Sequence, residues 1–253
     1  MNLKAFFDES EQADGLWCVA GCISSFEQWE LFESAWKSVL EHDDYKIEWH
    51  HQVDWTHTKK HFKKWNGDEH KKTKEDYQGN LLRIMDHHVM RYVGAVIPGS
   101  ACSALSEEQQ RKIQSPYLPC LQYCLHAAAL EAMDLPEEVK VDVVIAKRPG
   151  WKDRAEEIYR LAQKYLPLEA RKRLSQTVAI REMPKDLNNV CLGKDKPEIP
   201  LQAADIVAYE LGQYAQGKHR FPMTQLMKTE EHYFWKIFDT ATLNAACQPW
   251  TPP

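Results

Sequence analysis

Two short apolar segments near the N-terminus flank an Asp-Gly pair, and this pattern constrains the fold more than any other feature. Leu3–Phe7 (LKAFF) and Leu16–Ile23 (LWCVAGCI) are typical of strands, and Asp14-Gly15 between them favours a tight turn. Strands joined by such a turn pair in antiparallel fashion. The sequence therefore predicts a β-sheet that begins with an antiparallel pair.

The rest of the chain alternates helical and strand patterns. Helices are predicted over Phe26–Leu40, Thr73–His88, Tyr117–Met133, Trp151–Tyr165 and Ile199–Tyr214, and further strands over Tyr92–Ile97, Val139–Ala146 and Thr177–Ile180. The later strands are separated by helices long enough for crossover connections. We expect an α/β fold in which helices pack on a mixed sheet, antiparallel at its start, as in the ribonuclease H fold. We expect a single domain, 1–253, with an irregular insert rich in His, Trp and Lys around 46–75.

Composition excludes several classes of protein. The chain has 253 residues and a net charge of −5, so binding to nucleic acid would need a local basic patch. Apolar runs fall short of the ~18 residues of a membrane span, and MNLKAFFDES is not typical of a signal peptide. The seven cysteines form no CxxC pair, which favours reduced thiols packed in a core. These features indicate a cytoplasmic protein, and the absence of GxxxxGK[ST], GxGxxG and GxSxG argues against a P-loop NTPase, a nicotinamide enzyme and a serine hydrolase.

Acidic residues stand out in two segments because their surroundings are apolar. Asp8 and Glu9 follow the first predicted strand, and Asp205 interrupts the apolar helical segment PLQAADIVAYEL at Pro200–Leu211. Ionised groups beside a core are costly unless they are paired or bind a metal. Carboxylates that converge on Mg²⁺ or Mn²⁺ support phosphodiester hydrolysis. The alternative is structural: Asp205 bonds a neighbouring backbone group, and Asp8 and Glu9 belong to a turn.

Several segments together resemble a known family, the prokaryotic domain-of-unknown-function family 3800. The similar segments are FFDES at Phe6–Ser10 followed by LWCVAGCI, IEWHHQVDW at Ile47–Trp55, the aromatic pair Phe62 and Trp65, Ser115-Pro116-Tyr117, and PLQAADIVAYE at Pro200–Glu210. The resemblance spans nearly the whole chain. It implies a ribonuclease H-like fold.

The resemblance also implies a site. It makes Asp8, Glu48 and Asp205 ligands of a divalent metal, Mg²⁺ or Mn²⁺, with Glu9 and Asp195 as weaker candidates for the same cluster. One departure stands against it. Many relatives carry an acid at the end of the fourth strand, where this chain has Ala146-Lys147-Arg148, and Asp142 lies at the wrong end of the strand to replace it.

A lysine-rich stretch with interleaved aromatic residues runs through the insert. The lysines are Lys59, Lys60, Lys63, Lys64, Lys71, Lys72 and Lys74, and the aromatic residues are Trp55, Phe62 and Trp65. Lysines neutralise phosphates and aromatic rings stack on bases, so Lys59, Lys60, Lys63, Lys64 and Lys147 are candidate contacts to nucleic acid. The alternative is a solvated helix face.

The histidines of the same insert, His50, His51, His57 and His61, raise the alternative of a structural zinc. Since no cysteine lies nearby and no HExxH motif is present, we expect histidines that pack on aromatic rings or face solvent. A third role for His50 or His51 is proton transfer at the acidic site.

Two functional hypotheses follow. The first is a metal-dependent nuclease that hydrolyses phosphodiesters of DNA or RNA. The second is a catalytically silent member of the same fold that binds nucleic acid or a partner protein, as a component of a defence or mobile-element system. If the folded chain places Lys147 where a metal ion should lie, the second hypothesis gains support.

Overall fold

The computed structural model describes residues 2–12, 14–113, 115–136, 138–146, 152–181, 198–228 and 232–246. Its centre is a mixed sheet whose strands lie in the order β5-β4-β1-β2-β3-β6. The strands are β1 (Leu3–Glu11), β2 (Trp17–Ser25), β3 (Arg91–Ile97), β4 (Val141–Ala146), β5 (Leu174–Arg181) and β6 (Tyr233–Ile237).

The pairing of the strands confirms the predicted fold class. β1 pairs antiparallel with β2, and β2 pairs antiparallel with β3. β4 lies parallel to β1 and β5 parallel to β4, as crossover helices require. β6 was not predicted, and it extends the sheet by pairing parallel to β3. The protein thus has an α/β fold with an antiparallel start and helices packed on a mixed sheet.

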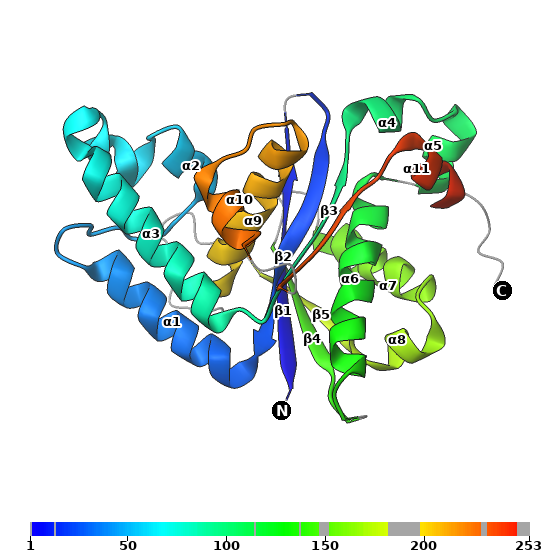
Figure 1. The fold of residues 1–253 in the computed structure, drawn as a ribbon. Coiled ribbons are helices and arrows are strands. Elements are labelled where there is room, and N and C mark those ends of the chain that lie inside the picture. The colour runs from blue at the N-terminus through cyan, green and yellow to red at the C-terminus, as the bar shows by residue number, and fades with distance from the viewer. Residues whose placement is uncertain are drawn as a thin grey trace.

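Helices cover both faces of this sheet (Figure 1). The longer helices are α1 (Phe26–Glu41), α3 (Lys71–His88), α6 (Tyr117–Met133), α7 (Lys152–Lys164) and α9 (Pro200–Ala215). The shorter ones are α2 (Gln52–Thr56), η1 (Lys60–Trp65), η2 (Asp68–His70), α4 (Gly99–Ser103), α5 (Glu107–Ile113), α8 (Leu168–Lys172), α10 (Phe221–Leu226) and α11 (Thr240–Ala246). In the described part of the chain, no helix combines the length and the apolar character needed to cross a membrane.

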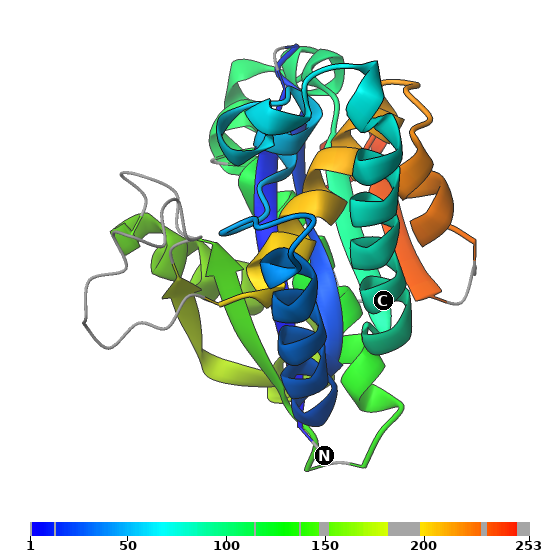
Figure 2. The same cartoon turned by 90° about the vertical axis from the view of Figure 1, so that its left-hand side faces the viewer.

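Two hydrophobic clusters lie on the opposite faces of the sheet. One joins Phe7 of β1 to α6 and α7, and the other joins Phe6 to α1, α3 and α9. Neighbouring residues of a strand point to opposite faces, which explains why Phe6 and Phe7 divide between the clusters. Figure 2 shows α1 and α3 in front of the sheet, with α9 crossing behind them.

Helix α9 packs closely against the strands. Proline begins it at its first position, where the missing N–H costs nothing, and the small residues Ala203, Ala204 and Ala208 are fully buried. On the strand side, a Cβ added at Gly94 of β3 would lie 2.3 Å from Cδ2 of Leu211. Small residues on both elements therefore bring α9 onto the sheet, together with the polar side chains it carries.

The irregular insert predicted around 46–75 forms α2, η1, η2 and the start of α3. It is held by aromatic packing: the rings of Trp55, Phe62, Trp65 and Tyr77 lie 5.2–6.0 Å apart by centroid. Such contacts supply apolar burial without a regular period, which is why the sequence pattern did not reveal these short helices.

Candidate functional site

Asp8 lies on β1, on the face that α9 covers. It shares this face with Phe6, two residues earlier, because side chains alternate along a strand. β1 pairs with β4 only through Phe7, so Asp8 comes directly after the last residue of that parallel pairing. The strand itself continues to Glu11, where it pairs with Trp17, so Asp8 and Glu9 lie within β1 and not in a turn.

The Asp8 carboxylate is held in a buried position. Asp8 is 6% exposed, and its Oδ1 accepts a 2.8 Å hydrogen bond from the backbone N–H of Glu9. Burial raises the pKa of Asp8 well above its ordinary value, and the charges of Glu9 and Asp205 raise it further. Burial and the neighbouring negative charges therefore both oppose the ionisation of Asp8.

Asp205 brings a second buried acid from α9 to the same place. It is also 6% exposed, and Oδ2 accepts a 2.6 Å hydrogen bond from the backbone N–H of Gln52. Burial raises the pKa of Asp205, whereas a positive charge on His51 and the bond from Gln52 lower it. The structural and the functional interpretations of Asp205 are thus compatible, since it bonds a backbone group and its charge also raises the pKa of Asp8.

A further buried acid, Asp54 of the short helix α2, acts electrostatically on Asp205. Its Oδ2 lies 2.9 Å from Nδ1 of His51 and 2.8 Å from Nζ of Lys60. Burial raises the pKa of Asp54, but Lys60 and His51 more than compensate, so the pKa lies below its ordinary value. The charge of Asp54 in turn raises the pKa of Asp205. Asp54 was not predicted as a site residue from the sequence, although its spacing of three residues from His51 is a signal of contact within a helical turn.

The structure does not bring Glu48 to this pair as expected. The Glu48 side chain is 41% exposed, and its Oε2 lies 4.0 Å from Nε2 of His61. Within the described ranges, no three His, Cys, Asp or Glu side chains are grouped so as to hold a metal ion. The expected set of Asp8, Glu48 and Asp205 is therefore present only as the pair Asp8 and Asp205, because the Glu48 side chain is exposed between the buried residues Ile47 and Trp49.

The remaining acidic candidates lie elsewhere. Alternation along β1 places Glu9 on the face covered by α6. There the pKa of Tyr117 is raised mainly by burial and further by the charge of Glu9. Asp195, like Lys147, lies outside the described residues. Ala146 is buried at the end of β4, and Asp142 is exposed at the beginning of that strand.

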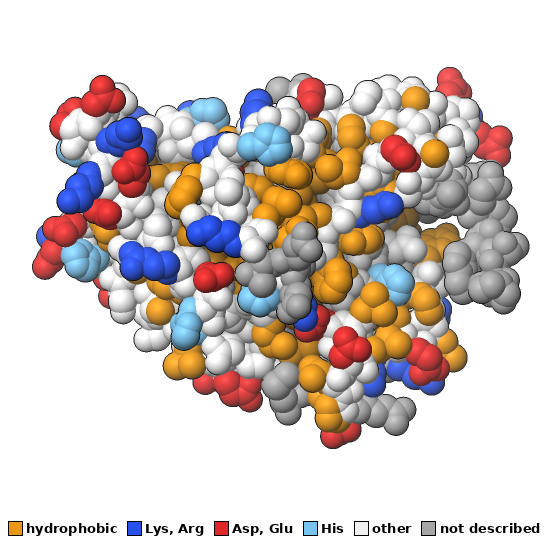
Figure 3. All heavy atoms as spheres, in the orientation of Figure 1, with side chains coloured by type: hydrophobic (Ala, Val, Ile, Leu, Met, Phe, Trp, Pro, Cys, Tyr) orange, Lys and Arg blue, Asp and Glu red, His pale blue; other side chains and the backbone are white. Residues whose placement is uncertain are grey.

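The candidate lysines occupy different environments. Lys59 and Lys63 are exposed, whereas Lys60 binds Asp54 and lies 5.7 Å from the ring centroid of Trp49. Lys64 donates to the backbone oxygens of Tyr45 and Lys46, so it ties the loop before the site to η1. On the face in Figure 3, basic and acidic side chains intermingle over the helices at the left and form no single basic area.

Two histidines of the insert, His50 and His61, pack on aromatic rings. His50 is 1% exposed and lies against Trp36, Phe62 and Tyr77, and burial lowers the pKa of His50 to about 4. The ring of His61 lies 4.3 Å from that of Trp49 by centroid. The cysteines that the structure describes, Cys18, Cys22, Cys102, Cys120 and Cys124, are free thiols. Both arrangements agree with the structural roles expected for these residues.

Asp8 and Asp205 offer the carboxylate oxygens that a divalent cation prefers. Two buried carboxylates repel each other when both are ionised, and a cation between them relieves that repulsion. Mg²⁺ commonly takes only one or two protein carboxylates and completes its shell with waters and substrate phosphates. Two carboxylates would therefore be enough for one such ion, whereas a second ion would need ligands that the described residues do not group there.

Comparison with protein-family models found no match, and no curated protein and no solved structure matches the chain.

Proposed function

We propose that the protein is a divalent-metal-dependent nuclease with its site at Asp8 and Asp205. The observation that carries the proposal is the convergence of these two buried carboxylates from β1 and α9, each with a raised pKa. Two acids placed together away from water are unfavourable unless something positive binds them. The resemblance to the domain-of-unknown-function family 3800 points to the same two residues.

Each residue has a role in this proposal. Asp8 and Asp205 hold Mg²⁺ or Mn²⁺, which supplies charge neutralisation at the phosphate and lowers the pKa of a bound water. Asp54 holds Nδ1 of His51, which fixes the orientation of the ring and leaves Nε2 to exchange a proton with water or substrate. Lys60 keeps Asp54 ionised for that task.

We also propose where the protein acts and on what. The substrate is DNA or RNA, and exposed Lys59 and Lys63 contact its phosphates. A cytoplasmic location agrees with the free thiols, since disulfides are rare in that compartment.

The test is cleavage of labelled single- and double-stranded DNA and RNA with Mn²⁺, with Mg²⁺ and with chelator. We expect cleavage that needs a metal and falls by more than about 100-fold in Asp8→Asn and in Asp205→Asn. Asp142→Asn is the matched control, because Asp142 is exposed at the opposite end of the neighbouring parallel strand. Equal loss of cleavage in the control would contradict the assignment.

The silent binder remains the second candidate, and the same experiment separates it. It requires binding to nucleic acid that weakens with salt, with no cleavage under any of the metal conditions. Absence of both binding and cleavage would leave a module that interacts with a partner protein.

A further inference from the structure

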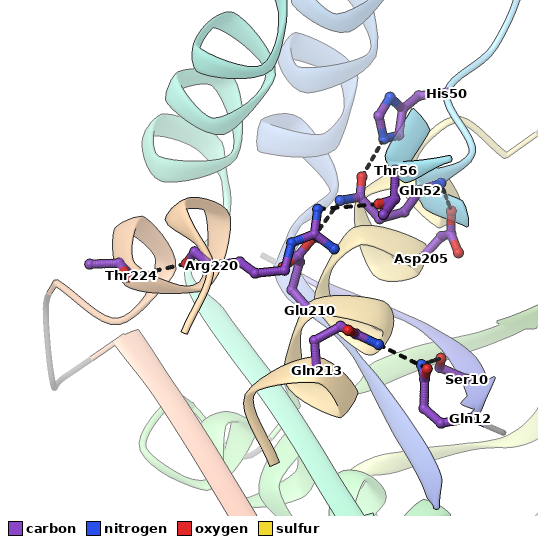
Figure 4. A network of polar contacts seen from close by, with 10 residues as sticks. All are labelled: Ser10, Gln12, His50, Gln52, Thr56, Asp205, Glu210, Gln213, Arg220 and Thr224. Carbon is purple, nitrogen blue, oxygen red and sulfur yellow. Dashed lines mark hydrogen bonds and ion pairs between the residues drawn. The ribbon is translucent and has the colours of Figure 1, made fainter. Parts of the chain in front are cut away.

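Three polar side chains of α9 bind one short stretch of the insert, residues 50–52. Gln202 accepts the backbone N–H of His50 at 2.6 Å through Oε1, and Asp205 accepts the backbone N–H of Gln52 at 2.6 Å. Glu210 accepts the side-chain amide of Gln52 at 2.5 Å through Oε1. Asp205 is thus the middle one of three attachments, and Figure 4 shows it together with Gln52 and Glu210.

Glu210 is the least expected member of this set. It is fully buried, and burial raises its pKa while Arg220 and Gln52 lower it. Nη1 of Arg220 lies 3.3 Å from Oε1 of Glu210, and Nη2 donates to Thr56 at 3.3 Å. Among the described residues nothing bonds Oε2 of Glu210. A buried carboxylate oxygen without a hydrogen bond destabilises the folded state, so the presence of Glu210 in this buried helix indicates a function.

Gln52 links that carboxylate to the acid pair. Its backbone N–H bonds Asp205, its Nε2 donates to Glu210, and its Oε1 lies 2.7 Å from Nε2 of His50. Because the side chain is held at both ends, the backbone N–H of Gln52 has little freedom to leave Asp205. His51 lies between the two attached residues, so its position relative to Asp205 is set by the same contacts.

We infer that Glu210, neutralised by Arg220, is a positioning residue that acts through Gln52 to fix the Asp205 carboxylate and His51 at the candidate site. The part of this inference that concerns the metal rests on the proposed function. The part that concerns the attachment of residues 50–52 to α9 does not.

The sharpest variant is Gln52→Met. It removes the hydrogen bond from the side chain of residue 52 to Glu210, but it leaves the backbone N–H at position 52 and the ion pair of Glu210 with Arg220 in place. Glu210→Ala removes the carboxylate itself, and Glu210→Gln keeps an oxygen that can accept from Gln52. Gln52→Met also keeps the test open if Glu210→Ala does not fold.

Glu131→Ala is the control for the loss of an acid that is paired with a partly exposed arginine. Arg91 and Glu131 lie on β3 and α6, on the other side of the sheet from α9. Arg91 and Arg220 have the same side-chain exposure, 27%. Any effect common to Glu131→Ala and Glu210→Ala therefore reflects general stability, and any difference reflects positioning.

The first readout is hydrogen exchange of the amide at position 52, measured by NMR without metal. We expect protection at this amide to fall at least about 10-fold in Gln52→Met and Glu210→Ala, with β1 and β2 amides unchanged, and to be restored in part by Glu210→Gln. Unchanged protection at position 52 in both Gln52→Met and Glu210→Ala would overturn the inference. So would an equal fall in Glu131→Ala.

The second readout is Mn²⁺ affinity by calorimetry at a temperature where every variant is folded. We expect about 10- to 100-fold weaker binding in Gln52→Met and Glu210→Ala, the size typical for residues that support a metal ligand, and no change in Glu131→Ala. Wild-type protein that binds no Mn²⁺ would contradict the proposed function, while the exchange measurement would still decide on the attachment. Wild-type affinity in both variants would overturn the metal part of the inference.

Discussion

The backbone N–H of Gln52 donates a 2.6 Å hydrogen bond to Oδ2 of Asp205, although 153 residues separate the two in the chain. This bond explains how a carboxylate persists in the otherwise apolar middle of α9. One oxygen of Asp205 supports the fold, and the group as a whole still opposes Asp8 electrostatically. Structure and chemistry therefore depend on the same side chain, and substitutions can separate them.

The choice of substitution at Asp205 should separate those two roles. Asp205→Ala leaves the buried N–H of Gln52 without an acceptor, which costs about 1–3 kcal/mol. Asp205→Asn keeps an acceptor oxygen and should lose much less of the free energy of unfolding. Urea unfolding in chelator measures both. Equal stability of the two variants would show that the bond contributes little.

Neutralising Asp8 should stabilise the protein at neutral pH when no metal is present. The folded-state pKa of Asp8 lies above its unfolded value, so folding favours its protonated form, and the associated stability is lost as the pH rises from about 4 through the folded pKa. Asp8→Asn should be free of this loss, which is about 1.4 kcal/mol for each pH unit that separates the folded pKa from the unfolded pKa. Unfolding curves from pH 4 to pH 8 in chelator measure the difference, and a variant that is less stable than wild type at pH 8 would contradict it.

Acid should destabilise the protein through His50. Burial lowers the pKa of His50 to about 4 from 6.5, so the folded state prefers the neutral ring. Stability is then complete above about pH 6.5 and is lost as the pH falls towards 4, by about 3 kcal/mol in all.

His50→Gln should weaken this pH dependence, so that the free energy of unfolding falls less between pH 6.5 and pH 4. The matched control is His57→Gln, because His57 is exposed in the same insert. The free energy of unfolding, measured between pH 4 and pH 7 for both variants and wild type, checks the prediction. If the free energy of unfolding of His50→Gln falls with decreasing pH as steeply as that of wild type, other groups cause the loss of stability in acid.

Two neighbouring lysines should behave differently. Lys63 is exposed, so Lys63→Ala should leave stability unchanged and reduce the salt dependence of nucleic-acid binding by about one phosphate contact, roughly 0.7–0.9 in the slope. Lys64 bonds backbone oxygens of Tyr45 and Lys46, so Lys64→Ala should lower the free energy of unfolding. Titrations at several salt concentrations, with thermal unfolding of each variant, check both outcomes. The reverse pattern would show that Lys64 and not Lys63 meets the phosphates.

Local patterns predicted most of the regular elements because each has its own signal. The strand at Tyr92–Ile97 became β3 with one more residue, and the helix at Tyr117–Met133 was placed at its observed bounds. The first strand was predicted too short, since its polar end is held by pairing with β2 and not by apolar residues. β6 was missed because it depends on an edge that β3 offers only in the folded protein.

The candidate site divides in the same way. Asp8 and Asp205 were recognisable because an acid in an apolar segment is unusual wherever the chain folds. Glu48 was inferred from the resemblance, but its segment turns its side chain partly to solvent beside His61. Glu210 offered the same signal as Asp205, since it lies in the same apolar segment, but it was not singled out. Asp54 offered only its spacing from His51, and Gln52 and Arg220 are ordinary polar residues until their partners are known.

The sequence by itself determined that this chain builds a mixed α/β sheet and that two acids stand among apolar residues. Periodicity, turn residues and the cost of burying charge depend on a few neighbouring residues, so they can be recognised in the sequence alone. Only the tertiary structure decided that α9 lies against β1, that residues 50–52 attach to α9, and that Arg220 reaches Glu210. Hydrogen bonds and ion pairs between distant segments depend on how two packed surfaces meet, and that geometry exists only once the sheet and its helices have assembled.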